Sequence, residues 1–191
     1  MHGDRPMPLR LLLPLFAGLL LMAGCASSDL DRLAPSPADP AADQPPGIGH
    51  GDFVAHSLSF EGRTVRYQVF VPMRLEATPI PLVLFLHGSG ERGDDNRRQL
   101  EAGLGPYLRA HGGRFKAPAV FPQAPTHREW SGGSAPMALA VLDDAARIYG
   151  ADPDRTYLTG ISMGGYGSWE LALIAPQRFA AIVPVCGGIT A

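Results

Sequence analysis

The segment Gly160-Ile161-Ser162-Met163-Gly164 places one serine between two glycines at the spacing G-x-S-x-G. The apolar stretch "RTYLTGIS" precedes the motif, and the helix-prone stretch "GGYGSWELALIA" follows it. A tight turn from strand to helix needs neighbours without side chains, and it exposes the serine hydroxyl beside the positive end of the helix. The pattern therefore predicts Ser162 as a nucleophile. The alternative is a glycine-rich turn whose serine has no chemical role.

A second motif, "LHGSGERG" at residues 86–93, follows a continuous apolar run. Attack by a serine on a carbonyl creates a negative oxygen, which two backbone N–H groups can hold. The candidate donors are Met163, directly after the serine, and Ser89 in this loop. We expect His87 to shape the loop rather than to accept the serine proton, although a strand-end histidine without a function fits the same position.

Alternating strands and helices position these motifs. Period-two patterns on both sides of Glu61-Gly62 predict an antiparallel hairpin, and continuous apolar runs predict buried parallel strands. One helix is predicted at residues 95–109, but Gly103, Gly105 and Pro106 weaken its second half. In the helix at 136–149, Met137, Val141, Ala145 and Ile148 form an apolar stripe. The predicted strands are 53–60, 63–72, 81–87, 117–123, 155–162 and 179–186, and the third helix is 164–175. The sequence thus predicts an α/β fold with a mostly parallel sheet and an antiparallel hairpin at its N-terminal edge.

The N-terminal residues resemble an export signal. Arg5 and Arg10 precede "LLLPLFAGLLLM", an apolar run shorter than the ~20 residues of a membrane-spanning helix. The following "LMAGCASS" is similar to the lipobox of bacterial lipoproteins, which implies lipidation of Cys25; ordinary signal cleavage near Ala26 is the alternative. We predict a lipoprotein signal peptide at residues 1–24 and a disordered tether, rich in Pro, Ala, Ser and Asp, at residues 25–50.

Composition narrows the remaining part, residues 51–191, to one globular domain. The chain of 191 residues is 46% hydrophobic and 18% charged with a formal net charge of −2. Its basic residues form no run, which argues against nucleic acid as a partner. Cys25 and Cys186 are its only cysteines, so we expect no internal disulfide and place Cys186 in the core. We expect no metal and no cofactor.

Residues 60–188 resemble the first two-thirds of an α/β-hydrolase esterase, in the group of carboxylesterases, phospholipases and polyhydroxybutyrate depolymerases. The resemblance lies in "LHGSGERGDDN", "FPQAP", "DRTYLTGISMGGYGSW" and "PQRFAAIVPVCGG". It implies Ser162 as nucleophile and Ser89 and Met163 as oxyanion donors. It also implies that Glu91, Arg92 and Trp130 line the approach to the site.

The resemblance also implies an acid and then a histidine after the serine. Glu170 is the only acid after Ser162, and it lies on the predicted helix. All of the histidines precede Ser162: His2, His50, His56, His87, His111 and His127. We therefore expect a partial α/β-hydrolase domain that lacks the last strands and the last helix of the fold. The alternative is that an upstream histidine, His127, completes the site, because geometry rather than chain order decides a triad.

Three functions are compatible with these residues. The favoured one is a serine esterase that forms an acyl-enzyme at Ser162, inactive as this chain. The others are a catalytically dead domain that binds an ester or glycan, and a cell-envelope interaction domain that shares only the fold. The substrate is open among short acyl esters, acyl groups on polysaccharide, polyesters and peptides. We expect no obligate protein partner, and we expect membrane attachment through the lipid anchor; Ala26 after Cys25 implies the outer membrane of the cell envelope.

Overall fold

The structure is a computed structural model that describes residues 51–75 and 79–189. The predicted signal peptide at 1–24, the tether at 25–50 and Cys25 lie outside the described residues. Within the described ranges, no helix has the length and hydropathy needed to cross a membrane.

The antiparallel hairpin is present as predicted. Strands β1 (Asp52–Phe60) and β2 (Arg63–Val71) pair over their whole length, and Phe60 opposes Arg63 at the turn. The two turn residues, Glu61 and Gly62, have φ values of 47° and 73°. Positive φ at both positions matches the right-handed twist of paired strands, which explains why a two-residue loop closes this hairpin.

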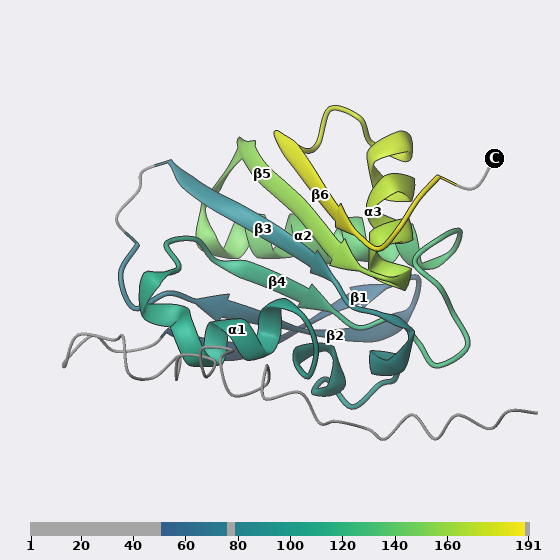
Figure 1. The fold of residues 1–191 in the computed structure, drawn as a ribbon, viewed down its shortest axis with the longest axis horizontal. Helices are drawn as coiled ribbons and strands as arrows, with labels where there is room; N and C mark the ends of the chain where they lie inside the picture. The colour runs from purple at the N-terminus through teal and green to yellow at the C-terminus, as the bar shows by residue number, and fades with distance from the viewer. Residues whose placement is uncertain (1–50, 76–78, 190–191) are drawn as a thin grey trace, which may run out of the picture. The chain divides into compact units, whose positions relative to one another are not determined.

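A six-stranded sheet with the order β1-β2-β4-β3-β5-β6 contains this hairpin at one edge. Strand β2 pairs antiparallel with β4, and the pairs β4/β3, β3/β5 and β5/β6 are parallel. Figure 1 shows the hairpin at one side of the sheet and β6 beside α3 (Met163–Ile174) at the other. The remaining strands are β3 (Ile80–Leu86), β4 (Ala119–Pro122), β5 (Ala151–Ile161) and β6 (Ala181–Val185). The predicted mixed sheet is therefore confirmed.

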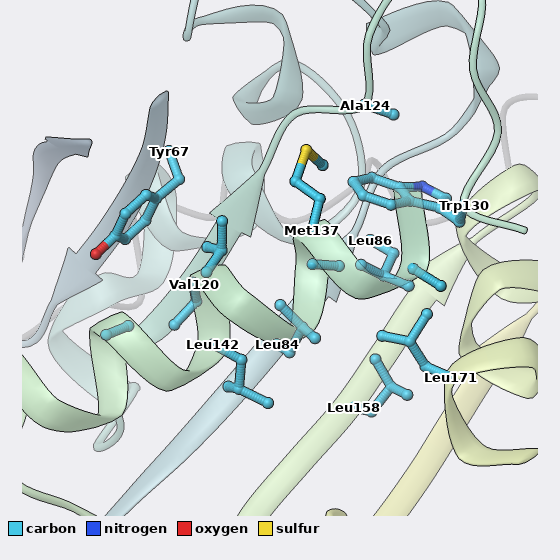
Figure 2. Close-up of a cluster of buried hydrophobic side chains, with 14 of the residues drawn as sticks. Tyr67, Leu84, Leu86, Val120, Ala124, Trp130, Met137, Leu142, Leu158 and Leu171 are labelled. Carbon is cyan, nitrogen blue, oxygen red and sulfur yellow. The ribbon is translucent and has the colours of Figure 1, made fainter. Parts of the chain in front are cut away.

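Side chains on the two faces of the sheet belong to two different cores. Leu82, Leu84 and Leu86 of β3 point into one core, which they share with α2 (Ser134–Tyr149) and α3 (Met163–Ile174). Figure 2 shows this core, where Leu142 from α2 and Leu171 from α3 lie near the strands. Phe85 points to the other face, where α1 (Leu104–His111) covers it. Burial on both faces explains the unbroken apolar run of β3.

The helix predicted at 95–109 is shifted towards the C-terminus. A 3-10 turn, η3 (Arg98–Leu100), stands where the regular first half was expected, and α1 begins only at Leu104. Pro106 is the third residue of α1, in the first turn, where a missing N–H costs no helical hydrogen bond. The glycines that weakened the prediction allow close packing instead. A Cβ on Gly103 would lie 2.5 Å from the Phe85 ring, and one on Gly105 would lie 2.3 Å from the Leu100 carbonyl oxygen.

Two positions predicted to be buried are exposed. Ile148, the last member of the apolar stripe on α2, is 42% exposed and lies in the last turn of the helix. Cys186 is exposed rather than in the core, and its φ is 54°. It follows the last residue of β6, where the chain turns away from the sheet. Two further 3-10 turns complete the described chain, η2 (Ser89–Glu91) and η4 (Gly112–Arg114).

Candidate active site

Ser162 lies on a sharp turn between the last residue of β5 and the first residue of α3. Its φ of 54° and ψ of −116° are rare for a residue with a side chain, and such a conformation costs roughly 1–3 kcal/mol. Two hydrogen bonds hold it. The Ser162 N–H donates to the Val185 carbonyl oxygen at 2.9 Å, and the Tyr166 N–H donates to the Ser162 carbonyl oxygen at 3.1 Å. The residue is exposed at the carboxyl ends of the parallel strands.

Three glycines around Ser162 permit this turn. A Cβ on Gly160 would lie 2.3 Å from the Gly164 carbonyl oxygen. A Cβ on Gly164 would lie 1.9 Å from the Leu86 carbonyl oxygen, and one on Gly165 would lie 2.4 Å from that of Val185. Each distance is far below a van der Waals contact. The start of α3 therefore packs directly on the backbone of β3 and β6, which explains the glycines of the motif in physical terms.

The loop after β3 runs beside the serine. A Cβ placed on Gly88 would be 3.9 Å from the Ser162 Cβ. Ser89 begins the turn η2, and Met163 is the first residue of α3. The first N–H groups of a helical segment have no partner within it, and the positive end of α3 lies at Ser162. This arrangement suits the predicted oxyanion role of Ser89 and Met163, which stays a prediction.

His87 is buried and neutral. Its Nε2 accepts the Ala124 N–H at 3.0 Å, so the proton of the ring is on Nδ1, which donates to the Gly88 carbonyl oxygen at 2.6 Å. The pKa of His87 is lowered to about 4, chiefly by burial; the Gly88 hydrogen bond opposes this shift, and the nearby charge of Arg92 adds to it. Both ring nitrogens are thus used to fix the loop, in agreement with the predicted scaffold role.

Trp130 supports the same loop from inside the fold. Its Nε1–H donates to the His87 carbonyl oxygen at 2.9 Å, and its ring packs edge-on against the imidazole at 4.9 Å. The side chain is fully buried beside Met137 and Leu86 (Figure 2). A Cβ on Gly167 would lie 2.3 Å from the Trp130 Cβ. The expectation that Trp130 lines the approach to the site is therefore wrong: the side chain is buried and supports the loop by its hydrogen bond to His87.

Glu91 and Arg92 are half-buried beside Ser89. A Cβ on Gly88 would be 3.0 Å from Glu91 Oε2, which places this carboxylate close to the serine. Arg92 Nε donates to the Ser89 carbonyl oxygen at 2.9 Å, so the guanidinium fixes the backbone of the predicted oxyanion donor. The structure thus brings both residues to the loop beside Ser162; contact with a substrate stays a prediction.

Gln123 is a positioning residue that the sequence analysis missed. Its Nε2 donates to the Glu91 carbonyl oxygen at 3.1 Å and to Asp95 Oδ1 at 3.0 Å, and its Oε1 accepts the Asn96 N–H at 2.8 Å. It is buried at the end of β4. The signal was present in "FPQAP", where an amide directly follows a buried strand.

No histidine in the described ranges is hydrogen-bonded to Ser162. His56 Nε2 lies 2.8 Å from the Tyr149 hydroxyl, and His111 stacks on Tyr107 at 4.7 Å. Both ring nitrogens of His87 are hydrogen-bonded to backbone groups. His127 is exposed on the loop after β4. Within the same ranges, no cluster of His, Cys, Asp and Glu has an arrangement suitable for a metal ion.

Solved structures share this arrangement of strands and helices. A thermostable esterase is similar over 73% of this chain and 42% of its own length, with 31% identity and a TM-score of 0.60. The S-formylglutathione hydrolase FrmB of Staphylococcus aureus matches 73% of this chain and 59% of its own length, with 19% identity and a TM-score of 0.57.

A third solved structure, the fluorophosphonate-binding serine hydrolase FphF of Staphylococcus aureus, matches 71% of this chain and 57% of its own length. Its identity is 22% and its TM-score 0.55. The chain therefore spans about half the length of these structures. No family model and no curated protein matches the sequence. Because the strand order, the serine turn and the comparisons agree, the fold of this chain is the α/β-hydrolase fold, and the solved structures that it resembles are esterases and serine hydrolases.

Proposed function

We propose that this chain supplies the nucleophile and the oxyanion donors of a serine ester hydrolase. The observation that carries the proposal is the strained, exposed Ser162, held by three glycines beside the loop of Ser89. Backbone strain of this kind persists only where the surrounding contacts impose it, and it is concentrated at functional sites. The esterases and serine hydrolases among the similar structures support the same reaction class.

The reaction proceeds through an acyl-enzyme. Ser162 Oγ attacks the carbonyl carbon of the ester, its proton passes to a base, and the N–H groups of Met163 and Ser89 hold the resulting oxyanion. The C–O bond then breaks, and the leaving alkoxide takes the proton from the base. Water attacks the acyl-enzyme in the same way and releases the acid.

The base is the part of the triad that these 191 residues do not offer at the family position, because every histidine precedes Ser162. Loss of the base in a serine hydrolase costs on the order of 10⁶ in kcat, while the oxyanion hole and binding retain ~10³ to 10⁴ over water. We therefore expect very slow turnover of p-nitrophenyl acetate by the chain alone. Imidazole in solution should act as a substitute base and raise the Ser162-dependent rate.

The test combines a fluorophosphonate probe with p-nitrophenyl acetate, each with and without imidazole. Labelling and turnover that rise with imidazole and vanish in Ser162→Ala would support the proposal. Fast labelling without imidazole that is lost in His127→Gln would assign the base to His127.

Because every histidine precedes Ser162 in the chain, a second candidate function is a catalytically inactive domain that binds an ester. Absence of Ser162-dependent reaction under every condition, together with retained binding of a non-hydrolysable ester analogue, would select it over the esterase.

A further inference from the structure

A pocket of about 500 Å³ lies away from Ser162 and plays no part in the chemistry described above. The hairpin tip forms one wall, the loop after β3 a second, and the start of α2 a third. Phe60, Val65 and Met137 contribute apolar surface to it. Polar groups face the same space, so the pocket has the mixed lining typical of small-molecule sites.

Three arginines line this pocket: Arg63, Arg66 and Arg128. Among the residues that the structure describes, none of the three forms an ion pair with a carboxylate. Arg66 Nη2 donates to the backbone carbonyl oxygen of Asp94, which holds its guanidinium against the pocket wall. Glu61 and Asp94 are the acids of the lining, so the arginines outnumber them.

The start of α2 adds a second feature that favours an anion. Ser134, the first residue of this 16-residue helix, lines the pocket and is 2% exposed. Its Oγ has no hydrogen-bond partner within the described part of the chain, which is costly for a buried hydroxyl. Arg128 comes close to the same turn, since a Cβ on Gly133 would be 2.5 Å from Arg128 Nη1. A helix N-terminus with a nearby guanidinium suits an oxyanion.

The pocket and Ser162 lie on the same side of the sheet, where the parallel strands have their carboxyl ends. Tyr67 pairs with Pro122, the last residue of β4, so Arg63 and Arg66 extend beyond the carboxyl end of that strand. Ser162 follows the carboxyl end of β5, which is separated from β4 by β3 alone. At ~4.8 Å per strand, the two places are roughly 10–15 Å apart.

A chain of contacts joins the two places. Glu91 lies at Gly88 beside Ser162, and its carbonyl oxygen accepts from Gln123 Nε2. Gln123 itself lines the pocket. We propose that this pocket binds an oxyanion, a carboxylate or a phosphate, at the far end of an extended ester substrate whose carbonyl lies at Ser162. Only the assignment to a substrate rests on the proposed function; the anion site stands on the pocket itself.

The experiment measures binding by calorimetry on the full chain carrying Ser162→Ala. This variant has no nucleophile, so the result is the same whether or not the chain is an esterase. The probes are an oligogalacturonate, a neutral galactose oligomer of the same length, and inorganic phosphate. We expect the acidic oligomer to bind and the neutral one not to bind. Arg63→Gln and Arg128→Gln should each weaken binding by roughly 10-fold.

Arg74→Gln is the matched control, because Arg74 is also exposed but follows β2 at the opposite end of that strand. It should leave binding unchanged. Binding of phosphate with the same dependence on Arg63 and Arg128, without binding of the oligogalacturonate, would support the site and assign it to phosphate. Equal binding of acidic and neutral oligomers, no binding of either anion, or an equal loss in the Arg74 variant would overturn the proposal.

Discussion

At the scale of single residues, the site is held by backbone contacts more than by side-chain networks. Ser162 donates to Val185, and Gly164 packs on the Leu86 carbonyl oxygen. His87 and Trp130 fix the neighbouring loop by hydrogen bonds to backbone groups. The strain at Ser162, of the order of 1–3 kcal/mol, is therefore offset by contacts that any side chain on these glycines would abolish.

His87 makes the stability of the domain depend on pH. Its pKa is about 4 in the folded state, against 6.5 when exposed, so between these values the unfolded chain binds the proton more readily. The contribution of neutral His87 to the free energy of unfolding is therefore fully present above pH 6.5, and it is lost as the pH falls towards 4. This difference in pKa corresponds to about 3 kcal/mol. A protonated ring also loses its ability to accept the Ala124 N–H.

Urea denaturation at pH 7 and at pH 4.5 tests this prediction. His87→Gln keeps an acceptor for the Ala124 N–H but has no proton to gain, so its stability should change less between the two pH values than that of the unaltered chain. His127→Gln removes an exposed histidine and serves as the control. If the His87 variant lost as much stability on acidification as the unaltered chain, the assignment would be wrong.

At the scale of elements, β6 is an edge strand of the described sheet with exposed apolar side chains. Val183 and Val185 are 62% and 42% exposed, and Leu173 on the neighbouring helix is 62% exposed. Within the described ranges, β6 pairs only with β5. An edge strand with apolar side chains and free backbone groups is a template for pairing with another chain.

We expect residues 51–191 alone to self-associate through β6. Val183→Lys should shift the protein towards the monomer, because a lysine on an edge strand opposes pairing between chains. Val54→Lys is the matched control, since Val54 lies on β1 at the opposite edge of the sheet. Sedimentation velocity measures the outcome. A monodisperse monomer before any substitution, or an equal effect of both lysines, would contradict the role of β6.

The sequence predicted the strands and the serine turn well because both depend on local patterns. Continuous apolar runs indicated β3 and β4, and the glycines around Ser162 indicated the turn. Long-range packing explains the differences. Gly105 and Pro106 are typical helix breakers, yet they lie in the first turn of α1, where Gly105 packs on the Leu100 backbone. The amide in "FPQAP" was a local signal for Gln123, but its partner Glu91 is 32 residues away, so the sequence did not show what it binds.

At the scale of the whole molecule, the hairpin does more than close one edge of the sheet. Its tip carries Arg63 and Arg66 to the side of the sheet where the parallel strands end and Ser162 lies, and Ser134 of α2 lines the same pocket. The residues that recognise an anion and the residue that attacks a carbonyl thus belong to different elements of one fold. The α/β-hydrolase fold fixes the position of the serine, whereas the loops around it decide what binds.

Membrane attachment through Cys25 would set where this site meets its substrate. If Cys25 is lipidated, two or more acyl chains give stable anchoring, whereas one chain would be marginal. We expect the native protein in the membrane fraction, labelled by a metabolic fatty-acid probe. Cys25→Ser should release it and abolish the label, while Cys186→Ser, which removes the other cysteine of the chain, should change neither. Recovery of the native protein in the soluble fraction, unlabelled and indistinguishable from Cys25→Ser, would refute the anchor and favour ordinary signal cleavage near Ala26.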